Sequence, residues 1–467
     1  MGRQISLTDD LVNVAHFVAM TPFAGDVALV GGYVRDQLLD VKAGHDADLV
    51  TTGDAIALAQ ALWQAGIARI EPVVYPRFGT ALIMVGETQV ELVTARRESY
   101  APDSRKPFVE AASLEEDARR RDFTVNTLMA ILPHDGVSAL VQDPLGQGLD
   151  DLAAKILRTP LDPKATFDDD PLRMLRAVRF RAQLGFEFAP GLPEAIRESS
   201  ERLCIVSRER VRDELSRMLL LPCADQALAD LMELGLMPYV IPELTDMPGV
   251  TQGDFHHLDA WDHTRLVVKQ SPGGDLVTRL AALLHDVGKP QTRTIDEAGR
   301  TRFFGHEQLG ADLAGRILRD LRYGNEIVLP VQKLVKHHMR FTGDNELSSA
   351  ACRRLIRDLG DDLGRLLDLV EADAASLKPG VRQLNLTALR KKLADIQIQT
   401  PRETLKSPLT GEEIMSILGV QPGAAVGQAK DYLANLVIEG ALSPDDKIEA
   451  EHRLRAFAAT IGQEGAA

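Results

Sequence analysis

The stretch "LVGGYVRDQLLDVKAGHDADLVTTG", from Leu29 to Gly53, contains a glycine pair, an arginine and two aspartates that lie two positions apart. The apolar residues after Asp46 and Asp48 predict a strand, in which residues i and i+2 point to the same face. Mg²⁺ takes oxygen ligands and is typically held by one or two carboxylates together with substrate phosphates. The stretch therefore predicts a magnesium site on a strand, although Asp-Ala-Asp alone also occurs in polar loops.

The glycine pair, Gly31 and Gly32, ends an apolar run and precedes the helical segment "YVRDQLL". Glycines at this position let backbone N–H groups approach a phosphate at the start of a helix. The spacing matches neither a Walker loop nor a dinucleotide fingerprint, because the following lysine or acidic partner is missing. The pair predicts a triphosphate contact only in combination with further motifs.

Length and composition indicate a protein of several domains. The chain has 467 residues, of which 45% are hydrophobic, 26% charged and only 5% aromatic, which is typical of globular proteins built largely from helices. We find no secretion signal and no apolar run long enough to span a membrane, so we expect a soluble, cytoplasmic protein. The sequence does not fix the oligomeric state.

The formal net charge of −15 argues against a protein coated with nucleic acid, because phosphate binding needs lysine and arginine. Any RNA must therefore meet a local basic surface. One group of arginines lies in two motifs described below. We interpret most of a second group as solvated helix faces; it comprises Arg202, Arg208, Arg210, Arg212 and Arg217.

The chain changes character near residue 145. Before it, short β-like runs alternate with helical segments; after it, apolar residues recur every three or four positions. We therefore expect an α+β fold, with a small sheet in an amino-terminal head and an all-helical remainder. Proline and glycine clusters place the boundaries. The expected domains are a head (1–145), a helical neck (146–250), a third domain (251–390) and a helical tail (391–467).

Two further motifs follow the first stretch in order: "RRDFTVNTLMA" at 120–130 and "DDPLRMLRAVRF" at 169–180. The series resembles the class II tRNA nucleotidyltransferases, which include bacterial CCA-adding enzymes and poly(A) polymerases. The resemblance implies a polymerase-β-like head in which Asp46 and Asp48 hold the catalytic metal. It also implies a set of nucleotide contacts, namely Gly31, Gly32, Arg35, Arg121, Asp122 and Asn126. Glu91 in "QVELVTA" is either a third carboxylate of this site or a surface strand residue.

The motif at 169–180 suggests how a base is read without a template. Cytosine and adenine present an amino donor beside a ring-nitrogen acceptor, whereas guanine and uracil present a carbonyl beside an N–H. Aspartate accepts and arginine donates, and Asp170 and Arg173 share a helix face. The family's motif is Glu-Asp-x-x-Arg, and here Asp169 takes the place of the glutamate. The alternative is that Asp170 only caps a helix that begins at Pro171.

Arg176 and Arg179 extend the same helix face. We predict that they contact the phosphates of the nucleotide or the acceptor stem of the RNA. Solvated arginines would give the same sequence pattern.

A second metal site is predicted from "WDHTRLVV" and "RLAALLHDVGKP", which supply His263, His285 and Asp286. This part resembles the HD phosphohydrolase superfamily, and the resemblance implies Asp373 as the fourth ligand. His306 and either His337 or His338 are candidates for a second ion. Imidazole with carboxylate suits a transition metal such as Mn²⁺ or Ni²⁺, or Mg²⁺, better than a closed zinc site. The alternative is an HD fold that has lost its metal.

Together these motifs predict addition of CCA to the 3′ end of tRNA from CTP and ATP, with Mg²⁺ in the head and a phosphohydrolase activity in the HD domain. A narrower enzyme, adding part of CCA or making poly(A), is one alternative. The segment "RRESYAPDSRKPFVE" at 96–110 predicts a loop that the family links to the switch from C to A, and this favours complete addition. A different alternative is an RNA-end phosphohydrolase whose head only binds tRNA.

Overall fold

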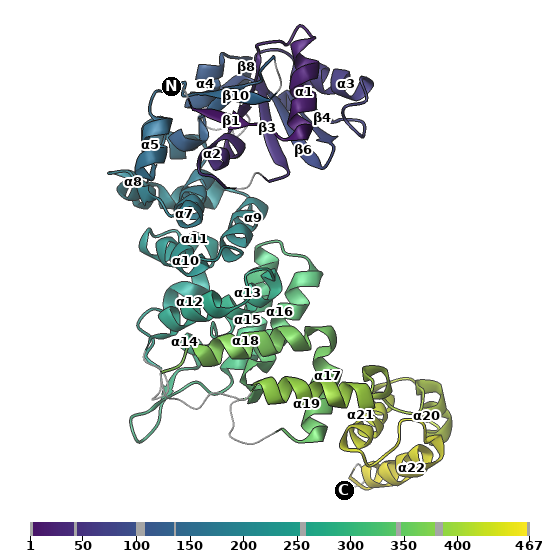
Figure 1. Ribbon diagram of the computed structural model, residues 1–467. Coiled ribbons are helices and arrows are strands. Elements are labelled where there is room, and N and C mark those ends of the chain that lie inside the picture. The colour runs from purple at the N-terminus through teal and green to yellow at the C-terminus, as the bar shows by residue number, and fades with distance from the viewer. Residues whose placement is uncertain are drawn as a thin grey trace. The chain divides into compact units, whose positions relative to one another are not determined.

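The computed structural model (Figure 1) describes residues 3–41, 44–99, 108–134, 137–252, 258–341, 347–378 and 386–464. The chain forms two compact units, Met1–Pro242 and Glu243–Ala467. The α+β class is confirmed, because the sheet belongs to the amino-terminal part and helices dominate the rest. The domain boundaries at 145, 250 and 390 stay predictions. No helix within the described ranges has the length and apolar character needed to cross a membrane.

The first unit is built on one eight-stranded sheet. Its strand order is β1 (Gln4–Ser6), β10 (Ser138–Gln142), β9 (Met129–Ile131), β2 (Val27–Val30), β3 (Asp46–Thr51), β6 (Thr88–Thr94), β5 (Thr80–Val85) and β4 (Val73–Tyr75). All neighbours are antiparallel except β3 and β6, which are parallel. A parallel pair needs a crossover connection, and the chain between β3 and β6 includes α3 (Ala55–Gln64), which packs on β5 and β6.

Local sequence explains where α3 begins and which face it buries. The Asp54 carboxylate accepts hydrogen bonds from the backbone N–H groups of Ile56 (2.9 Å) and Ala57 (3.1 Å), which satisfies two amides at the start of the helix. Leu58 and Leu62, four residues apart, are fully buried on the side that faces the sheet. Helix α1 (Asp9–Ala19) likewise buries one apolar face.

The neck continues the first unit with helices that pack on one another. They are α5 (Gly148–Ala154), α6 (Pro163–Asp169), α7 (Leu172–Leu184), α8 (Leu192–Ser199), α9 (Arg208–Leu219), α10 (Ala224–Glu233) and α11 (Met237–Val240). Helix α7 packs against both α9 and α10.

The expectation of an all-helical remainder after residue 145 is wrong in detail. Ile156–Leu157 pairs with Glu187–Phe188, and Thr294–Ile295 pairs with Thr301–Arg302 in the second unit. Runs of two residues are too short to show a strand period in the sequence, so periodicity alone could not reveal them.

The second unit is almost wholly helical. Its first part contains α12 (Ala260–Gln270), α13 (Leu276–Leu284), α14 (Lys289–Thr292), α15 (His306–Asp320), α16 (Asn325–His337), α17 (Ser349–Leu359), α18 (Leu363–Ala375) and α19 (Leu386–Gln399). The tail, α20 (Gly411–Leu418), α21 (Ala424–Glu439) and α22 (Lys447–Glu464), has an apolar cluster of its own that includes Ile414, Leu433 and Leu454. Helix α13 contacts α12, α16 and α18, so chain segments distant in sequence meet around it.

Candidate active sites

The first site lies where β3 and β6 run side by side. In β3, Asp46 and Asp48 are accessible and Ala47 between them is buried, so both aspartates share a face, as the sequence predicted. The parallel register sets Glu91 of β6 directly opposite Asp48. Three acidic residues therefore lie on neighbouring strands.

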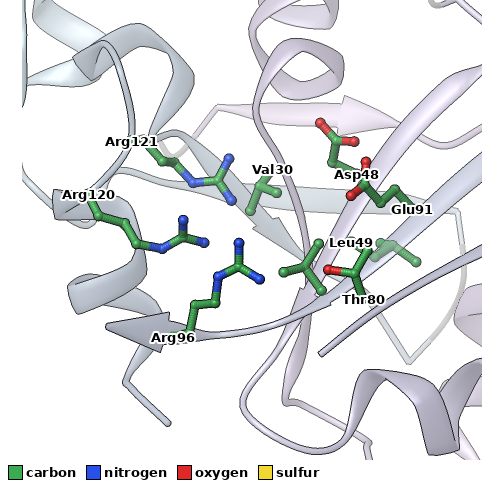
Figure 2. Close-up of a pocket in the computed structure, with 9 residues that line it drawn as sticks. Val30, Asp48, Leu49, Thr80, Glu91, Arg96, Arg120 and Arg121 are labelled. Carbon is green, nitrogen blue, oxygen red and sulfur yellow. The ribbon is translucent and has the colours of Figure 1, made fainter. Parts of the chain in front are cut away.

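Asp48 and Glu91 line a pocket together with Thr80, Arg96, Arg120 and Arg121 (Figure 2). In Figure 2 the two carboxylates lie on one side and the three guanidinium groups on the other.

Both acids of the pocket are partly desolvated. The protein around the Asp48 carboxylate raises its pKa by desolvation, and the nearby Asp46 adds to this, while Arg121 opposes it. Desolvation, together with Asp48, also raises the pKa of Glu91. A cation between these acids would relieve their repulsion.

The acidic group is open rather than closed. Among the described residues, the clusters that bring three ligand atoms within 4.8 Å of one another both lie in the second unit. An open carboxylate set suits Mg²⁺, which keeps water ligands and completes its coordination with substrate phosphates. The oxygen-only donor set thus fits the predicted metal.

Gly31 is the point at which β2 turns into α2 (Gly32–Leu38), with a φ of 72°. A side chain at this position would be strained, because L residues rarely adopt this backbone conformation. Its Cβ would lie 3.3 Å from Asp48 Oδ2 and 3.5 Å from Arg121 Nη1. The turn predicted from the glycine pair is therefore confirmed, and it abuts the acidic group.

Three of the predicted nucleotide contacts and Arg176 form one hydrogen-bonded chain. Arg35 Nη1 donates to Asn126 Oδ1 at 2.6 Å, Asn126 Nδ2 donates to Asp122 Oδ1 at 3.0 Å, and Arg176 Nε donates to Asp122 Oδ2 at 2.8 Å. Burial tends to raise the pKa of Asp122, but Arg176 and Asn126 outweigh it and lower that pKa. The chain ties α2 and the "RRDFT" segment to α7.

Arg179 lies further along α7 and is buried, with 7% of its surface exposed. Its Nε donates to Glu214 Oε2 of α9 at 2.6 Å, and its guanidinium lies over the Phe180 ring, 4.1 Å from the ring centre. In this conformation Arg179 holds α7 against α9, and its predicted contact with nucleotide or RNA stays a prediction.

Asp170 and Arg173 lie at the start of α7, and both side chains form hydrogen bonds within the protein. Asp170 Oδ1 accepts from the Leu172 N–H at 3.2 Å, so the capping contact exists. Arg173 donates to the backbone carbonyls of Arg120 and Thr166. A carboxylate has about four lone-pair positions, so capping and base reading are compatible. Asp169 is the last residue of α6.

The second site is centred on Asp286, at the carboxyl end of α13. Its Oδ2 lies 3.1 Å from His285 Nε2 and 3.8 Å from His263 Nε2. Its Oδ1 lies 3.5 Å from His306 Nε2 and 3.9 Å from His338 Nε2. The five side chains form two overlapping triads that share Asp286, and all are buried.

The histidine ring orientations suit metal binding. The Nδ1 atoms of His285, His306 and His338 lie 2.8, 2.7 and 2.6 Å from the backbone carbonyls three residues earlier. Each Nδ1 therefore donates, which leaves Nε2 as the acceptor. Within the described part of the chain these three Nε2 atoms are buried and receive no hydrogen bond, as expected of atoms that ligate a cation. The donor set fits a transition metal or Mg²⁺ and does not support a decayed site.

Burial and neighbouring charged groups shift the pKa values of side chains in the cluster. Burial lowers the pKa of His338 to about 3. Asp373 approaches the first triad, with Oδ1 3.0 Å from His263 Nε2; although burial would raise its pKa, that contact lowers it.

The sequence left His337 and His338 open as candidates for a second ion, and the two residues lie in different surroundings. His338 belongs to the second triad, whereas His337 lines a separate pocket with Lys336 and Arg340.

Sequence reasoning missed several residues of these sites. Lys289 Nζ lies 2.6 Å from Asp286 Oδ2, and its position three residues after Asp286 on a helical turn was the available signal. Arg96 enters the first pocket from the strand pair β7 (Arg96–Ser99) and β8 (Phe108–Ala111). That pairing joins two ends of the predicted loop, whose residues 100–107 lie outside the described part.

Comparison with known proteins matches a domain model to the part of the chain that contains each site. The chain matches the poly(A) polymerase head domain over residues 27–158, a probable RNA- and SrmB-binding site of polymerase A over 185–247, and the HD domain over 256–395. It is 35% identical to the A-adding tRNA nucleotidyltransferase of Deinococcus radiodurans, with 89% of this chain and 92% of that protein covered. The chain belongs to the tRNA nucleotidyltransferase family.

Other members of the family differ in what they add. The CC-adding tRNA nucleotidyltransferase of Thermus thermophilus is 34% identical over 91% of this chain and 92% of its own length. A multifunctional CCA protein of Cupriavidus metallidurans is 34% identical over 71% of this chain and 78% of its own length. Among solved structures, the CCA-adding enzyme of Bacillus stearothermophilus in complex with CTP has the same fold, with a TM-score of 0.69 and 22% identity over 98% of this chain and all of that one.

Proposed function

We propose that this nucleotidyltransferase adds C, C and A to the 3′ end of tRNA from CTP and ATP without a nucleic-acid template. The observation that carries the proposal is the pocket in which Asp48 and Glu91 face three arginines. Acids that hold cations and arginines that bind phosphates are the two requirements of nucleotidyl transfer. A cytoplasmic location, where tRNA is matured, stays a prediction.

In the proposed reaction the 3′-hydroxyl of the tRNA attacks the α-phosphorus of the nucleotide, and pyrophosphate leaves. Asp46 and Asp48 would hold magnesium, which would supply polarisation of the attacking oxygen and neutralisation of the leaving group. Arg96, Arg120 and Arg121 bind triphosphate oxygens across the pocket. Catalysis of this kind depends mainly on positioning and on electrostatic stabilisation.

The base is read by Asp170 and Arg173, which offer one acceptor and one donor. Cytosine and adenine satisfy this pair, whereas the carbonyl of uracil or guanine would face the Asp170 carboxylate. One reading site would therefore serve both C and A. The capping contact of Asp170 leaves carboxylate lone pairs free to accept the amino group of a base.

The extent of addition distinguishes complete from partial enzymes, and relatives of both kinds match the chain at similar identity. The test uses tRNA transcripts that end before CCA, after C and after CC, resolved at single-nucleotide length with Mg²⁺, CTP and ATP. We expect all three to be extended and to stop at CCA. Extension of only one class, or a long adenosine tail, would reject complete addition in favour of a partial enzyme or a poly(A) polymerase.

We also propose that the HD unit is a phosphohydrolase that removes phosphate groups from RNA ends. The two triads that share Asp286 favour this second activity, because paired cations can bind both oxygens involved in a displacement at phosphorus. The ion is Mn²⁺, Ni²⁺ or Mg²⁺, as the mixed donor set suggests.

Replacement of His285 and Asp286 by alanine tests this second activity. We expect two reactions to disappear: opening of 2′,3′-cyclic phosphates to monophosphates and release of phosphate from terminal monophosphates. Nucleotide addition should persist because its ligands lie on β3 and β6. His337→Ala is the matched control, since His337 lies outside both triads. Phosphate release that survives the double replacement would reject the proposed site. Loss of nucleotide addition as well would reject the assignment of the two activities to separate units.

A further inference from the structure

Asp170 occupies the link between α6 and α7, where no regular structure fixes its side chain. Its backbone is extended, with φ −147° and ψ 101°, and about a quarter of its side chain is exposed. A side chain in such a link samples several rotamers unless a partner holds it. The proposed reading of the base requires its carboxylate in one place.

Arg210 of α9 provides that partner. Its Nη1 donates to Asp170 Oδ1 at 3.1 Å and its Nη2 donates to Oδ2 at 2.7 Å. Two parallel bonds between a guanidinium and a carboxylate fix orientation as well as distance. Arg210 therefore has a specific partner, although half of its side chain is exposed.

Helix α9 is itself firmly anchored. Glu214 Oε2 accepts a hydrogen bond from Arg179 Nε at 2.6 Å. Arg208 donates hydrogen bonds to the backbone carbonyls of Tyr239 (2.7 Å) and Val240 (2.9 Å). Arg210 thus projects from a helix that is fixed on both sides of it. The position of the Asp170 carboxylate follows from that of α9.

We infer that Arg210 is a specificity-determining positioning residue, which orients Asp170 so that its carboxylate accepts the amino group common to cytosine and adenine. The inference rests on the proposed function. Arg210 and the Leu172 N–H occupy three of about four lone-pair positions, and one remains for a base. A uracil or guanine carbonyl at that position would meet another acceptor and be repelled.

Arg173, the proposed hydrogen-bond donor to the base, is held in place by other groups than Asp170 is. Arg173 donates to the carbonyls of Arg120 and Thr166, which are not the groups that Arg210 binds. Loss of Arg210 therefore leaves Arg173 in place and loosens only the acceptor. The expected result is weaker discrimination against uracil and guanine, not general inactivity.

The test compares kcat/KM for CTP and UTP on a transcript that ends before CCA, using the full chain. We expect Arg210→Ala to lower the CTP-to-UTP ratio about tenfold, the scale of the net contribution of one hydrogen bond. The CTP-to-UTP ratio of Arg210→Lys should lie between those of the wild type and Arg210→Ala. Lysine keeps the positive charge but cannot form two parallel hydrogen bonds with a carboxylate. Arg202→Ala is the matched control: Arg202 pairs with Asp168 of α6 at 3.0 Å, and its loss should leave the ratio unchanged.

A double-mutant cycle separates positioning from a general structural effect. If Arg210 acts through Asp170, Arg210→Ala should cause no further change in the ratio when Asp170→Asn is already present. Additive effects, or an unchanged ratio in a normally folded Arg210→Ala protein, would overturn the inference. Failure of the wild-type protein to add any nucleotide would instead refute the proposed function on which it rests.

Discussion

At the residue scale, the two sites differ in how their ligands are held. Three of the HD histidines are fixed by backbone carbonyls, which orient each Nε2 toward Asp286. The head carboxylates lie on open strands and rely on strand register for their placement. The closed cluster is suited to a resident ion, and the open group is suited to an ion that arrives with the nucleotide.

Asp122 has a structural role that can be measured apart from catalysis. It is buried between Arg176 and Asn126, which together lower its pKa below the ordinary value of 3.8. A carboxyl whose pKa is lower in the folded protein stabilises the fold above its unfolded pKa and loses that contribution as pH falls. Asp122→Asn should therefore lower the free energy of unfolding at pH 7 by about 3 kcal/mol, as expected for breaking a buried ion pair.

Urea unfolding followed by Trp63 fluorescence measures this effect in the first unit. The chain has two tryptophans, so a Trp261→Phe background leaves Trp63 as the single reporter. The difference in unfolding free energy between the protein with Asp122 intact and the Asp122→Asn variant should be constant from pH 7 to about pH 4 and shrink below it. A difference that does not change with pH would show that the charge of Asp122 is not the cause.

At the element scale, the sequence predicted local features well and pairings poorly. The two-residue repeat of a strand correctly predicted that Asp46 and Asp48 share a face. The glycine pair correctly predicted the turn before α2. Glu91 was left open because its role depends on β6 lying parallel to β3, although α3, β4 and β5 separate the two strands in the chain. Strand order is a tertiary property, and a single sequence shows only its periodicity.

In the neck, the sequence likewise could not predict which charged side chains bind one another. Helix periodicity predicted that Asp170 and Arg173 share a face, but it could not show that Arg210 binds Asp170 or that Arg179 turns inward to Glu214. Both contacts require α7 and α9 to pack together. Arginines that hold two helices together therefore have the same pattern in the sequence as solvated ones.

At the scale of the whole molecule, the described residues include a set of candidate metal ligands in each of the two compact units. The net charge of −15 is compatible with RNA binding because arginines gather in the head pocket and along α7. We therefore propose nucleotide addition for the first unit and phosphate release for the second.

We propose that Asp46 and Asp48 carry the transfer reaction, and primer extension on tRNA tests this. Single-nucleotide-resolved extension of a tRNA transcript lacking CCA is compared for the wild type, the Asp46→Ala/Asp48→Ala protein and the His285→Ala/Asp286→Ala protein, each with an unfolding curve. We predict a loss of at least about a thousandfold in the first variant, the scale of removing a main electrostatic contribution to catalysis, and none in the second. Addition retained in a folded protein without Asp46 and Asp48 would contradict the account.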